Sequence, residues 1–297
     1  MPIPREQHTS DVLAFLRHKF PGRDWALSLP SHGTGHESYF AKSGMGEYFI
    51  KLGVAPERYR ILASLRVTPR MVAAGALVDG TSLVIQDKIS GHLPTGQDFQ
   101  NRLDQFAGII HAVHHHEALK GILPQTPSDL FRLTGLDAFT QLEQRWSRFK
   151  HLVPSSAVFV EKSLSQIKTQ IDQMQGGGLV ASHNDPCNGN WLVATDGTVY
   201  LLDYESMSRD DPALDLGALL WWYYPPQLRG DFLSLAGYAR DANIRHRMRI
   251  RMAMHCLNII LPREHSFDGF DASGFEDSLA DFRAVLEGEE NPQGYAN

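Results

Sequence analysis

The stretch that most constrains the fold of this chain lies at residues 179–203 and reads LVASHNDPCNGNWLVATDGTVYLLD. Its first residues form a short apolar run that ends at His183. A loop rich in turn-forming residues follows at once and carries Asp185. Apolar runs bounded by such residues are typical of short strands. The sequence therefore predicts a strand that delivers a carboxylate onto a loop.

A β-hairpin is predicted directly after this loop. Two short strands, residues 191–194 and 198–202, are joined by the Asp-Gly dipeptide at 196–197, which favours a two-residue turn. Asn190 lies six residues before the Asp of the turn, and Asp203 lies six after its Gly. A regular register would place these two side chains about 5 Å apart at Cβ. An amide oxygen and a carboxylate so placed suit Mg²⁺, which takes hard oxygen ligands.

The polar residues of this stretch have the spacing of a kinase catalytic loop and its metal-binding aspartate. The pattern is His183-x-Asp185-x4-Asn190, followed by Asp203. Asp185 is then expected to orient a substrate hydroxyl or accept its proton. Asn190 and Asp203 are expected to hold the Mg²⁺ that neutralises the transferring phosphoryl group. The pattern favours phosphoryl transfer to a hydroxyl.

Three segments of this region resemble the aminoglycoside phosphotransferase and choline kinase superfamily of small-molecule kinases: HNDPCNGNWL, LLDYE at 201–205 and DDPALDL at 210–216. The resemblance is close over residues 182–220 and weak elsewhere. It implies an α+β, bilobal, protein-kinase-like fold. The N-lobe would be a small antiparallel sheet at residues 1–88, and the C-lobe a larger, mainly helical domain at 89–297. It also implies ATP or GTP and Mg²⁺ as cosubstrates and a small-molecule hydroxyl as acceptor.

Three short strand candidates lie in the expected N-lobe, at residues 25–29, 38–42 and 47–51. The turn between the first two contains Gly33 and Gly35 and ends at Ser38. By the resemblance, its backbone N–H groups would cover the nucleotide phosphates, with an ordinary flexible turn as the alternative. Lys51 ends the third strand and would neutralise the α- and β-phosphates. A solvated strand end is the other interpretation of this lysine.

The rest of the nucleotide site is also assigned by the resemblance. Glu57, the only carboxylate in the helix that begins near Pro56, is expected to pair with Lys51. The segment after the next hairpin resembles the connection between the lobes. Main-chain groups near Gln86, Lys88 and Ile89 are expected to hydrogen-bond adenine.

Histidines and a buried carboxylate accompany the helical part of the chain. His111 and His115 have the i, i+4 spacing that can seat a metal, but no glutamate accompanies them as in a zinc hydrolase helix. A structural role for His111 is the favoured interpretation. Asp215 lies inside an apolar helix face and needs partners. By the resemblance, Asp215 would brace the catalytic loop through backbone N–H groups or His183.

The acceptor site is expected close in sequence to the metal aspartate. Glu205 and Asp210 could attract a protonated amine, and the ring faces of Trp222 and Tyr223 could bind a quaternary ammonium. Core packing is the alternative for the rings. An amino alcohol of the choline or ethanolamine kind is favoured, with an aminoglycoside antibiotic or another small metabolite as alternatives.

An arginine-rich stretch at residues 240–251 belongs to a predicted helix. An amphipathic helix with a solvated basic face is the favoured interpretation. A stripe that binds a phosphate or an acid is the alternative.

Composition narrows the partners and the compartment. A formal charge of −6 and a pI near 6.1 argue against nucleic acid or an anionic membrane as the main partner. Cys187 and Cys256 are expected to be free thiols in a reducing compartment. The sequence has neither a leader-like apolar segment nor a run of membrane-spanning length. We expect a cytoplasmic protein that is a monomer or a homodimer.

Two other classes of function compete with a small-molecule kinase. One is a pseudokinase that binds a nucleotide without turnover, although each expected catalytic position carries a competent side chain. The other is a metal-dependent hydrolase built on His183, Asp185 and the histidines at 111–116. Release of ADP in the presence of a hydroxyl acceptor distinguishes the kinase from both.

Overall fold

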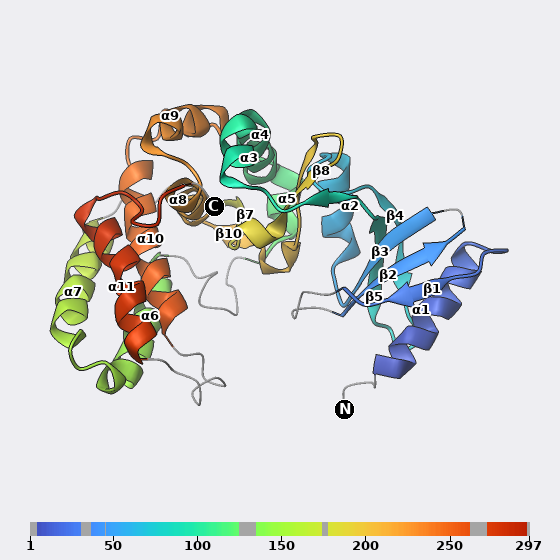
Figure 1. Ribbon diagram of the computed structural model, residues 1–297, viewed down its shortest axis with the longest axis horizontal. Helices are drawn as coiled ribbons and strands as arrows, with labels where there is room; N and C mark the ends of the chain where they lie inside the picture. Colours follow the sequence, from blue (N-terminus) through green and yellow to red (C-terminus); the bar gives the residue numbers. More distant parts are fainter. Residues whose placement is uncertain are drawn as a thin grey trace. The chain divides into compact units, whose positions relative to one another are not determined.

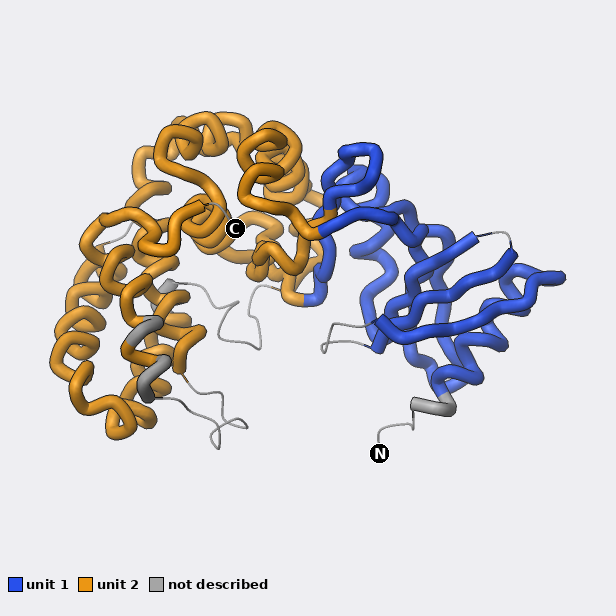
Figure 2. The backbone as a smooth tube through the Cα atoms, in the orientation of Figure 1, with its two compact units in different colours: residues 1–92, 193–205 blue, residues 93–192, 206–297 orange. Residues whose placement is uncertain are grey.

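The computed structural model describes residues 5–30, 37–44, 46–124, 135–173, 178–261 and 272–295 (Figure 1). These residues fold as two compact units (Figure 2). Unit 1 comprises Met1–His92 and Val193–Glu205, and unit 2 comprises Leu93–Leu192 and Ser206–Asn297. The sequence predicts one boundary after residue 88. The structure instead returns a later segment, which includes Asp203, to the first unit.

Unit 1 contains an antiparallel sheet whose strand order, within the described residues, is β1-β2-β3-β5-β4. The elements are α1 (Arg5–Lys19), β1 (Ala26–Ser28), β2 (Ser38–Ser43), β3 (Gly46–Leu52), α2 (Pro56–Ser64), β4 (Met71–Ala76), β5 (Ser82–Asp87), β6 (Gly91–His92) and β9 (Val199–Leu201). Val12 and Leu16 of α1 belong to the same buried cluster as Ile50 of β3. The apolar residues of α1 therefore pack with those of the sheet.

The second helix of unit 1 is defined by its ends. Pro56 occupies the first turn of α2, where its missing N–H costs no hydrogen bond. Arg66 follows the helix with a φ of 60°, a left-handed conformation that ends helical geometry. Tyr59 and Leu62 are buried, and α2 contacts β4 and β5. The helix thus presents Tyr59 to the interior of unit 1.

Unit 2 is mainly helical. Its elements are α3 (Gly96–Asn101), α4 (Leu103–His114), α5 (Glu117–Ile122), α6 (Gly135–Phe149), α7 (Ala157–Gln173), β7 (Val180–Ser182), β10 (Ser208–Asp210), α8 (Ala213–Trp222), α9 (Pro226–Leu235), α10 (Ile244–Ile260) and α11 (Ala272–Glu287). Strand β8 (Trp191–Ala194) begins in unit 2 and ends in unit 1. A core of apolar side chains from α6, α7, α8, α10 and α11 includes Phe139, Leu164 and Phe282.

Residues 96–114 form two consecutive helices, α3 and α4. Thr95 and Asp98 form a capping box that starts α3. The backbone leaves helical geometry at Arg102, with φ −119° and ψ 27°, and α4 begins at the next residue. Phe99 and Ile110 are fully buried, so apolar side chains of both helices pack inward despite the break.

The catalytic-loop stretch is supported by a buried helix and a short strand pair. Residues from Ala213 to Trp221 of α8 are all buried, including Asp215. Strand β7 is buried along its length and pairs antiparallel with β10, Ser182 opposite Ser208. Hydrogen bonding by the pair fixes the point at which the chain leaves β7 for the loop. None of the helices in the described residues has both the length and the apolar character needed to cross a bilayer.

Candidate active site

Lys51 carries a buried positive charge at the end of β3. It is 8% exposed, and its Nζ contacts the carboxylates of Asp203 and Glu205, the latter at 2.6 Å from Oε2. A buried ammonium is costly unless it is paired. Unit 1 therefore surrounds Lys51 with two carboxylates supplied by the segment that the chain returns to it.

Helix α2 holds this carboxylate segment in place. The Tyr59 hydroxyl donates to Oε1 of Glu205 at 2.6 Å, and the Arg58 guanidinium donates to the backbone carbonyl of Tyr204. Burial and the neighbouring Glu205 charge raise the pKa of Tyr59 well above its usual value. The phenol thus stays a hydrogen-bond donor. Both oxygens of Glu205 are engaged, one by Lys51 and one by Tyr59.

The carboxylates that meet Lys51 are not the one expected from α2. Glu57 is exposed, whereas Tyr59, two residues later, is 3% exposed. Two residues turn an α-helix by about 200°, so the face that carries Tyr59 inward points Glu57 to solvent. The expectation that Glu57 pairs with Lys51 is corrected: Asp203 and Glu205 do so.

This difference gives a prediction for two glutamates. Glu205→Ala should lower the free energy of unfolding by about 1.5–3 kcal/mol, because it leaves the buried Tyr59 hydroxyl without its partner and removes one of the two carboxylates that pair with Lys51. Glu57→Ala, the matched control on an exposed position, should change it by about 0.5 kcal/mol or less. Urea unfolding of both variants measures the effect. Equal losses would contradict the assignment of Glu205 as the partner.

The other residues of unit 1 that are predicted to bind the nucleotide differ in their structural surroundings. Ser38 begins β2 and lies opposite Lys51 in the β2–β3 ladder. The predicted Gly33 and Gly35 lie outside the described residues. The side chain of Gln86 donates to Thr68 Oγ1 and Pro69 O and is buried, so its role here is internal.

The connecting segment after β5 keeps part of its backbone engaged. The N–H of Lys88 donates to the Glu47 carbonyl at 3.2 Å, and its Nζ contacts the Glu47 carboxylate at 2.6 Å. Ile89 is half-buried. An adenine contact by the N–H of Lys88 would therefore compete with a sheet hydrogen bond. Adenine recognition by this segment stays a prediction.

In unit 2, the loop after β7 exposes Asp185 on a rigid support. Asn190 Nδ2 donates to the backbone carbonyl of Asp185 at 2.8 Å and to its Oδ2 at 3.1 Å. The N–H of Asn188 donates to the Tyr223 hydroxyl at 2.8 Å. Burial raises the pKa of the Cys187 thiol to about 12, so this neighbour stays uncharged. The loop offers Asp185 as its exposed carboxylate.

Asp215 is the anchor of that loop. Its oxygens accept hydrogen bonds from the N–H groups of His183, at 2.7 Å, and Asn184, at 2.8 Å. His114 Nε2 lies 2.9 Å from Oδ2 of Asp215, and His114 Nδ1 lies 2.8 Å from the Tyr238 hydroxyl. Burial alone would raise the pKa of Asp215, but these partners lower it. Asp215 thus holds the backbone of the loop through two N–H groups, and its support of a catalytic site stays a prediction.

His114 was not singled out from sequence, although it belongs to the histidine cluster noted there. His111 and His115 each place a ring nitrogen 3.3 Å from the carbonyl of Ala236, and their rings are 4.7 Å apart. Among the described residues, no group of three or more histidine, cysteine, aspartate or glutamate side chains could hold a metal ion. The local contacts of His111 and His115 are those of packed side chains.

The residues predicted to bind Mg²⁺ flank the strands of the hairpin, as the predicted strand bounds imply. Asn190 ends a 3-10 turn directly before β8, and Asp203 follows β9 with a φ of 59°. The amide nitrogen of Asn190 donates to Asp185. This hydrogen bond does not use the amide oxygen. Asp203 is exposed. An amide oxygen and a carboxylate are a donor set that fits Mg²⁺.

Two predicted acceptor residues are used elsewhere. Glu205 contacts Lys51 and Tyr59, as described. Asp210 is fully buried in β10 and pairs with Arg251 at 3.2 Å, and burial raises its pKa to about 7. Neither carboxylate is available to a ligand. The expectation that they bind the acceptor is therefore corrected, because one neutralises Lys51 and the other closes an internal ion pair.

The aromatic candidates lie beside the catalytic loop. The Tyr223 ring stacks on Phe99 at 4.3 Å, and its hydroxyl holds Asn188. Trp222 is half-buried and meets the ring of His255 edge-on at 5.3 Å. Burial lowers the pKa of His255 to about 4, against the opposing charge of Asp185. The His255 ring is thus neutral at physiological pH.

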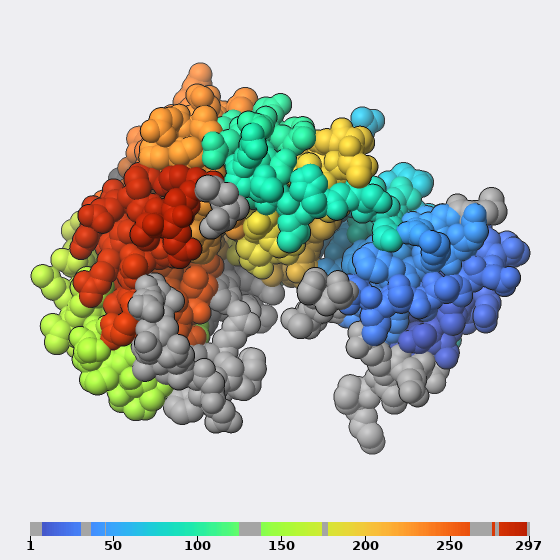
Figure 3. Space-filling view, viewed as in Figure 1, coloured from blue at the N-terminus to red at the C-terminus, as the bar shows by residue number. Residues whose placement is uncertain are grey.

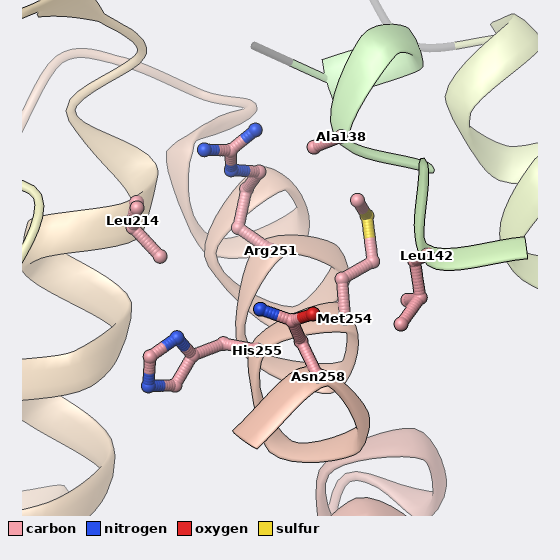
Figure 4. Close-up of a pocket in the computed structure, with 7 residues that line it drawn as sticks. All are labelled: Ala138, Leu142, Leu214, Arg251, Met254, His255 and Asn258. Carbon is pink, nitrogen blue, oxygen red and sulfur yellow. The ribbon is translucent and has the colours of Figure 1, made fainter. Parts of the chain in front are cut away.

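His255 also lines a pocket, and sequence reasoning had passed over it. The pocket is bounded by residues of α6, α8 and α10: Ala138, Leu142, Leu214, Arg251, Met254, His255 and Asn258. The His255 ring points from α10 toward α8 (Figure 4). The residues that surround His255 in the pocket come partly from α6 and α8. The sequence of α10 alone therefore gives no signal that distinguishes this histidine.

Comparison with known proteins bears on the family and the fold of the chain. A family model described as "Phosphotransferase enzyme family" matches residues 27–250 of the 297. A choline/ethanolamine kinase family protein from Mesorhizobium loti superposes with a TM-score of 0.65 at 19% identity, covering 94% of each chain. The α+β, protein-kinase-like fold class is confirmed by such neighbours.

Two antibiotic-modifying enzymes are similar to a comparable degree. Aminoglycoside 2'-phosphotransferase-IIIa, in a GDP complex, has a TM-score of 0.64 at 13% identity and covers 96% of this chain and 99% of its own. Spectinomycin phosphotransferase, in complex with ADP and spectinomycin, has a TM-score of 0.60 at 15% identity, with coverages of 97% and 98%.

Proposed function

Because the chain belongs to the phosphotransferase enzyme family, we propose that it moves the γ-phosphoryl group of ATP or GTP, with Mg²⁺, to a hydroxyl of a small molecule. The observation that carries this is the setting of Lys51, a buried ammonium held between Asp203 and Glu205 at the end of a strand. A fixed cation of this kind suits the charge of nucleotide phosphates. Structural neighbours crystallised with ADP or GDP support a nucleotide as the donor.

The roles proposed for the site residues follow from what each can do. Lys51 would neutralise nucleotide phosphates as they bind. Asp185, exposed on a loop braced by Asp215, would orient the acceptor hydroxyl and take its proton. Asn190 and Asp203 would hold Mg²⁺, which supplies neutralisation of the charge on the phosphoryl group. Phosphoryl transfer of this kind depends on positioning and electrostatics, and these residues provide both.

For the acceptor we propose an amino alcohol of the choline or ethanolamine kind. The support is the half-buried Trp222 beside a neutral His255, near Asp185. Ring faces attract a quaternary ammonium, and a neutral histidine does not repel it. A polyamine antibiotic would need several carboxylates, yet Glu205 and Asp210 are both engaged internally. Both classes of acceptor occur among proteins of this fold, so an experiment must decide.

A coupled assay of ADP release tests the function and the acceptor together. The purified chain would be supplied with ATP or GTP, Mg²⁺ and, in separate reactions, choline, ethanolamine, homoserine, glucose, kanamycin or spectinomycin. Release above the acceptor-free rate with choline or ethanolamine supports the proposal. Release with the antibiotics alone refutes the acceptor class and keeps phosphotransfer. Nucleotide binding without release for any acceptor would instead indicate a pseudokinase.

Trp222 provides a prediction for acceptor binding. Trp222→Ala should raise KM for choline by about 2- to 30-fold with little change in kcat, since one good cation–π contact is worth about 0.5–2 kcal/mol. Trp222→Phe keeps a ring face and should lose much less. Steady-state kinetics of both variants, with thermal melting as a check on folding, gives the comparison. Equal KM values in the wild type and in Trp222→Ala would show that this ring only fills the core.

A further inference from the structure

Unit 2 has a second pocket, away from the residues discussed above, among α8, α9, α10 and the end of α11. Its volume is about 150 Å³. The lining residues are Gly217, Leu220, Trp221, Arg229, Arg245, Met248, Arg249, Met252, Val285, Gly288, Glu289 and Glu290. Aliphatic, thioether and indole groups make up its apolar part, guanidinium groups its basic part, and the carboxylates of Glu289 and Glu290 its acidic part. A cavity of this size accommodates a body about as large as a benzene ring.

One stripe of α10 supplies both kinds of lining. Arg245, Met248, Arg249 and Met252 are spaced i, i+3, i+4 and i+7, which places them on one face of the helix. The two arginines therefore lie one turn apart on the same side. Like charges at this spacing repel each other. The repulsion is relieved if an anion binds between them.

The arginines of α10 divide into two groups by their partners. Arg247 is buried and pairs with Asp211 and Asp241, both at 2.8 Å, and Arg251 pairs with Asp210, as described. Arg245 and Arg249 are exposed. Within the described residues, neither of these two makes a hydrogen bond or an ion pair. Two arginines of α10 are therefore used in internal ion pairs. The other two line the pocket.

A buried donor also lines the pocket without a partner. Trp221 is 8% exposed, and its indole Nε1 is buried with no hydrogen-bond acceptor among the described residues. A buried polar group normally has a partner. Gly217, one turn earlier on α8, lets α10 approach closely: a Cβ there would lie 3.2 Å from the Met248 carbonyl. The indole nitrogen itself has no exposed surface, whereas the guanidinium groups of Arg245 and Arg249 are exposed and lack acceptors. A ligand with several acceptor oxygens would supply the acceptors for these two arginines.

The end of the chain is fixed at the rim of this pocket. Arg229 contacts Glu290 at 2.9 Å and donates to the Tyr295 hydroxyl at 2.8 Å, and its Nε donates to the Tyr224 carbonyl. Figure 3 shows the C-terminal segment (red) adjoining α9 (orange) on the face of unit 2. Because Arg229 is satisfied by Glu290, the cations left for a ligand are Arg245 and Arg249.

We propose that this pocket binds a phosphate monoester with a compact apolar body. A planar guanidinium group can donate two hydrogen bonds to phosphate oxygens. Two guanidinium groups match the double charge of a phosphate monoester, whereas a carboxylate ligand has only a single charge. The apolar body would lie against Leu220, Met248 and Met252, and the phosphate oxygens at the arginines. This site is separate from the nucleotide position at Lys51 and does not depend on the proposed reaction.

Isothermal titration of the full chain with phenyl phosphate tests the site, with phenol and inorganic phosphate as comparators. Phenyl phosphate should bind more tightly than either, because each comparator lacks one half of the ligand. Arg245→Ala and Arg249→Ala should each weaken binding about tenfold, the loss expected for a hydrogen bond to a charged group. Arg240→Ala is the matched control, an exposed arginine of the same segment that does not line the pocket, and should leave the affinity within about twofold.

The same titration of Lys51→Ala separates this pocket from the nucleotide site. Unchanged affinity in Lys51→Ala, together with loss in the two arginine variants, supports the proposal. Affinity lost in Lys51→Ala and kept in Arg245→Ala and Arg249→Ala places the phosphate at the nucleotide site and overturns it. Absence of binding to the wild type at millimolar phenyl phosphate also overturns it, and shows Arg245 and Arg249 to be only solvated. Folding of each variant is checked by its melting temperature.

Discussion

Asp185→Asn is expected to lower turnover by about 100-fold or more, the loss that follows from removing a positioned base, with nucleotide affinity little changed. An asparagine has the size of aspartate but no negative charge and no site to take a proton. The loop itself should survive, because Asp215 holds the N–H groups of His183 and Asn184 and not the side chain of Asp185. Any loss therefore reports the carboxylate. Initial rates of ADP release and titration with nucleotide measure the two effects separately.

Asp196→Asn is the control for this experiment. Asp196 is an exposed aspartate in the turn between β8 and β9, where its Oδ1 accepts from the Thr198 N–H at 2.9 Å. Asparagine is as favourable as aspartate in such a turn. The rate of ADP release by Asp196→Asn should therefore stay close to that of the wild type. If Asp185→Asn kept activity within a few-fold of the wild type, Asp185 would not be the group that handles the acceptor hydroxyl.

Asp203→Ala should differ in kind, because it should weaken Mg²⁺-dependent nucleotide binding along with turnover. We expect an affinity loss of about tenfold or more, the scale for losing one charged contact. Lys51 keeps Glu205 as a partner, so the variant should still fold. Nucleotide titrations with and without Mg²⁺ measure the effect. The wild type should show a large difference between the two conditions and the variant a small one.

Backbone geometry calls for a second variant at this position. Asp203 has a φ of 59°, which alanine adopts with strain and asparagine tolerates. Asp203→Asn therefore removes the charge without the strain, and its loss of Mg²⁺ dependence should resemble that of Asp203→Ala. If both variants kept the affinity and the Mg²⁺ dependence of the wild type, Asp203 would not be a metal ligand.

The elements that sequence predicted well are those whose signals are local. Strand β7 and the loop carrying Asp185 come from a short apolar run next to turn formers, and β7 is found at Val180–Ser182. The hairpin around 196–197 follows from one dipeptide. Lys51 was placed at a strand end from its neighbours alone. In each case a few consecutive residues contain the information, so no knowledge of the rest of the chain is needed.

The residues that sequence placed poorly depend on which face of an element points inward. Glu57 and Tyr59 lie two positions apart in α2, and only the packing of that helix makes Tyr59 the buried one. Asp210 looked like a ligand carboxylate because its partner, Arg251, lies 41 positions away. Strand β10 has no periodic pattern and exists because β7 offers it a ladder. Contacts across such distances leave no trace in local spacing.

His114 and His255 illustrate the same limit at the site itself. His114 lies in α4 and His255 in α10. The sequences of these helices indicate no role for either histidine beyond packing. Their proposed relevance comes from Asp215 for His114 and from Trp222 for His255. Both partners belong to α8, whereas the histidines belong to α4 and α10. A single sequence can offer such residues as candidates, but their partners are identified only when the helices are packed.

The return of a late segment to unit 1 has a consequence for synthesis on the ribosome. Lys51 is 152 positions ahead of Asp203 and 154 ahead of Glu205. At typical elongation rates, its carboxylates appear roughly 8–30 s after the lysine. Until then a buried Lys51 would lack its counter-charges, which is strongly unfavourable. The nascent N-terminal sheet therefore cannot bury a paired Lys51 until Asp203 and Glu205 have been synthesised. A polypeptide that ended at His92 would lack both carboxylates.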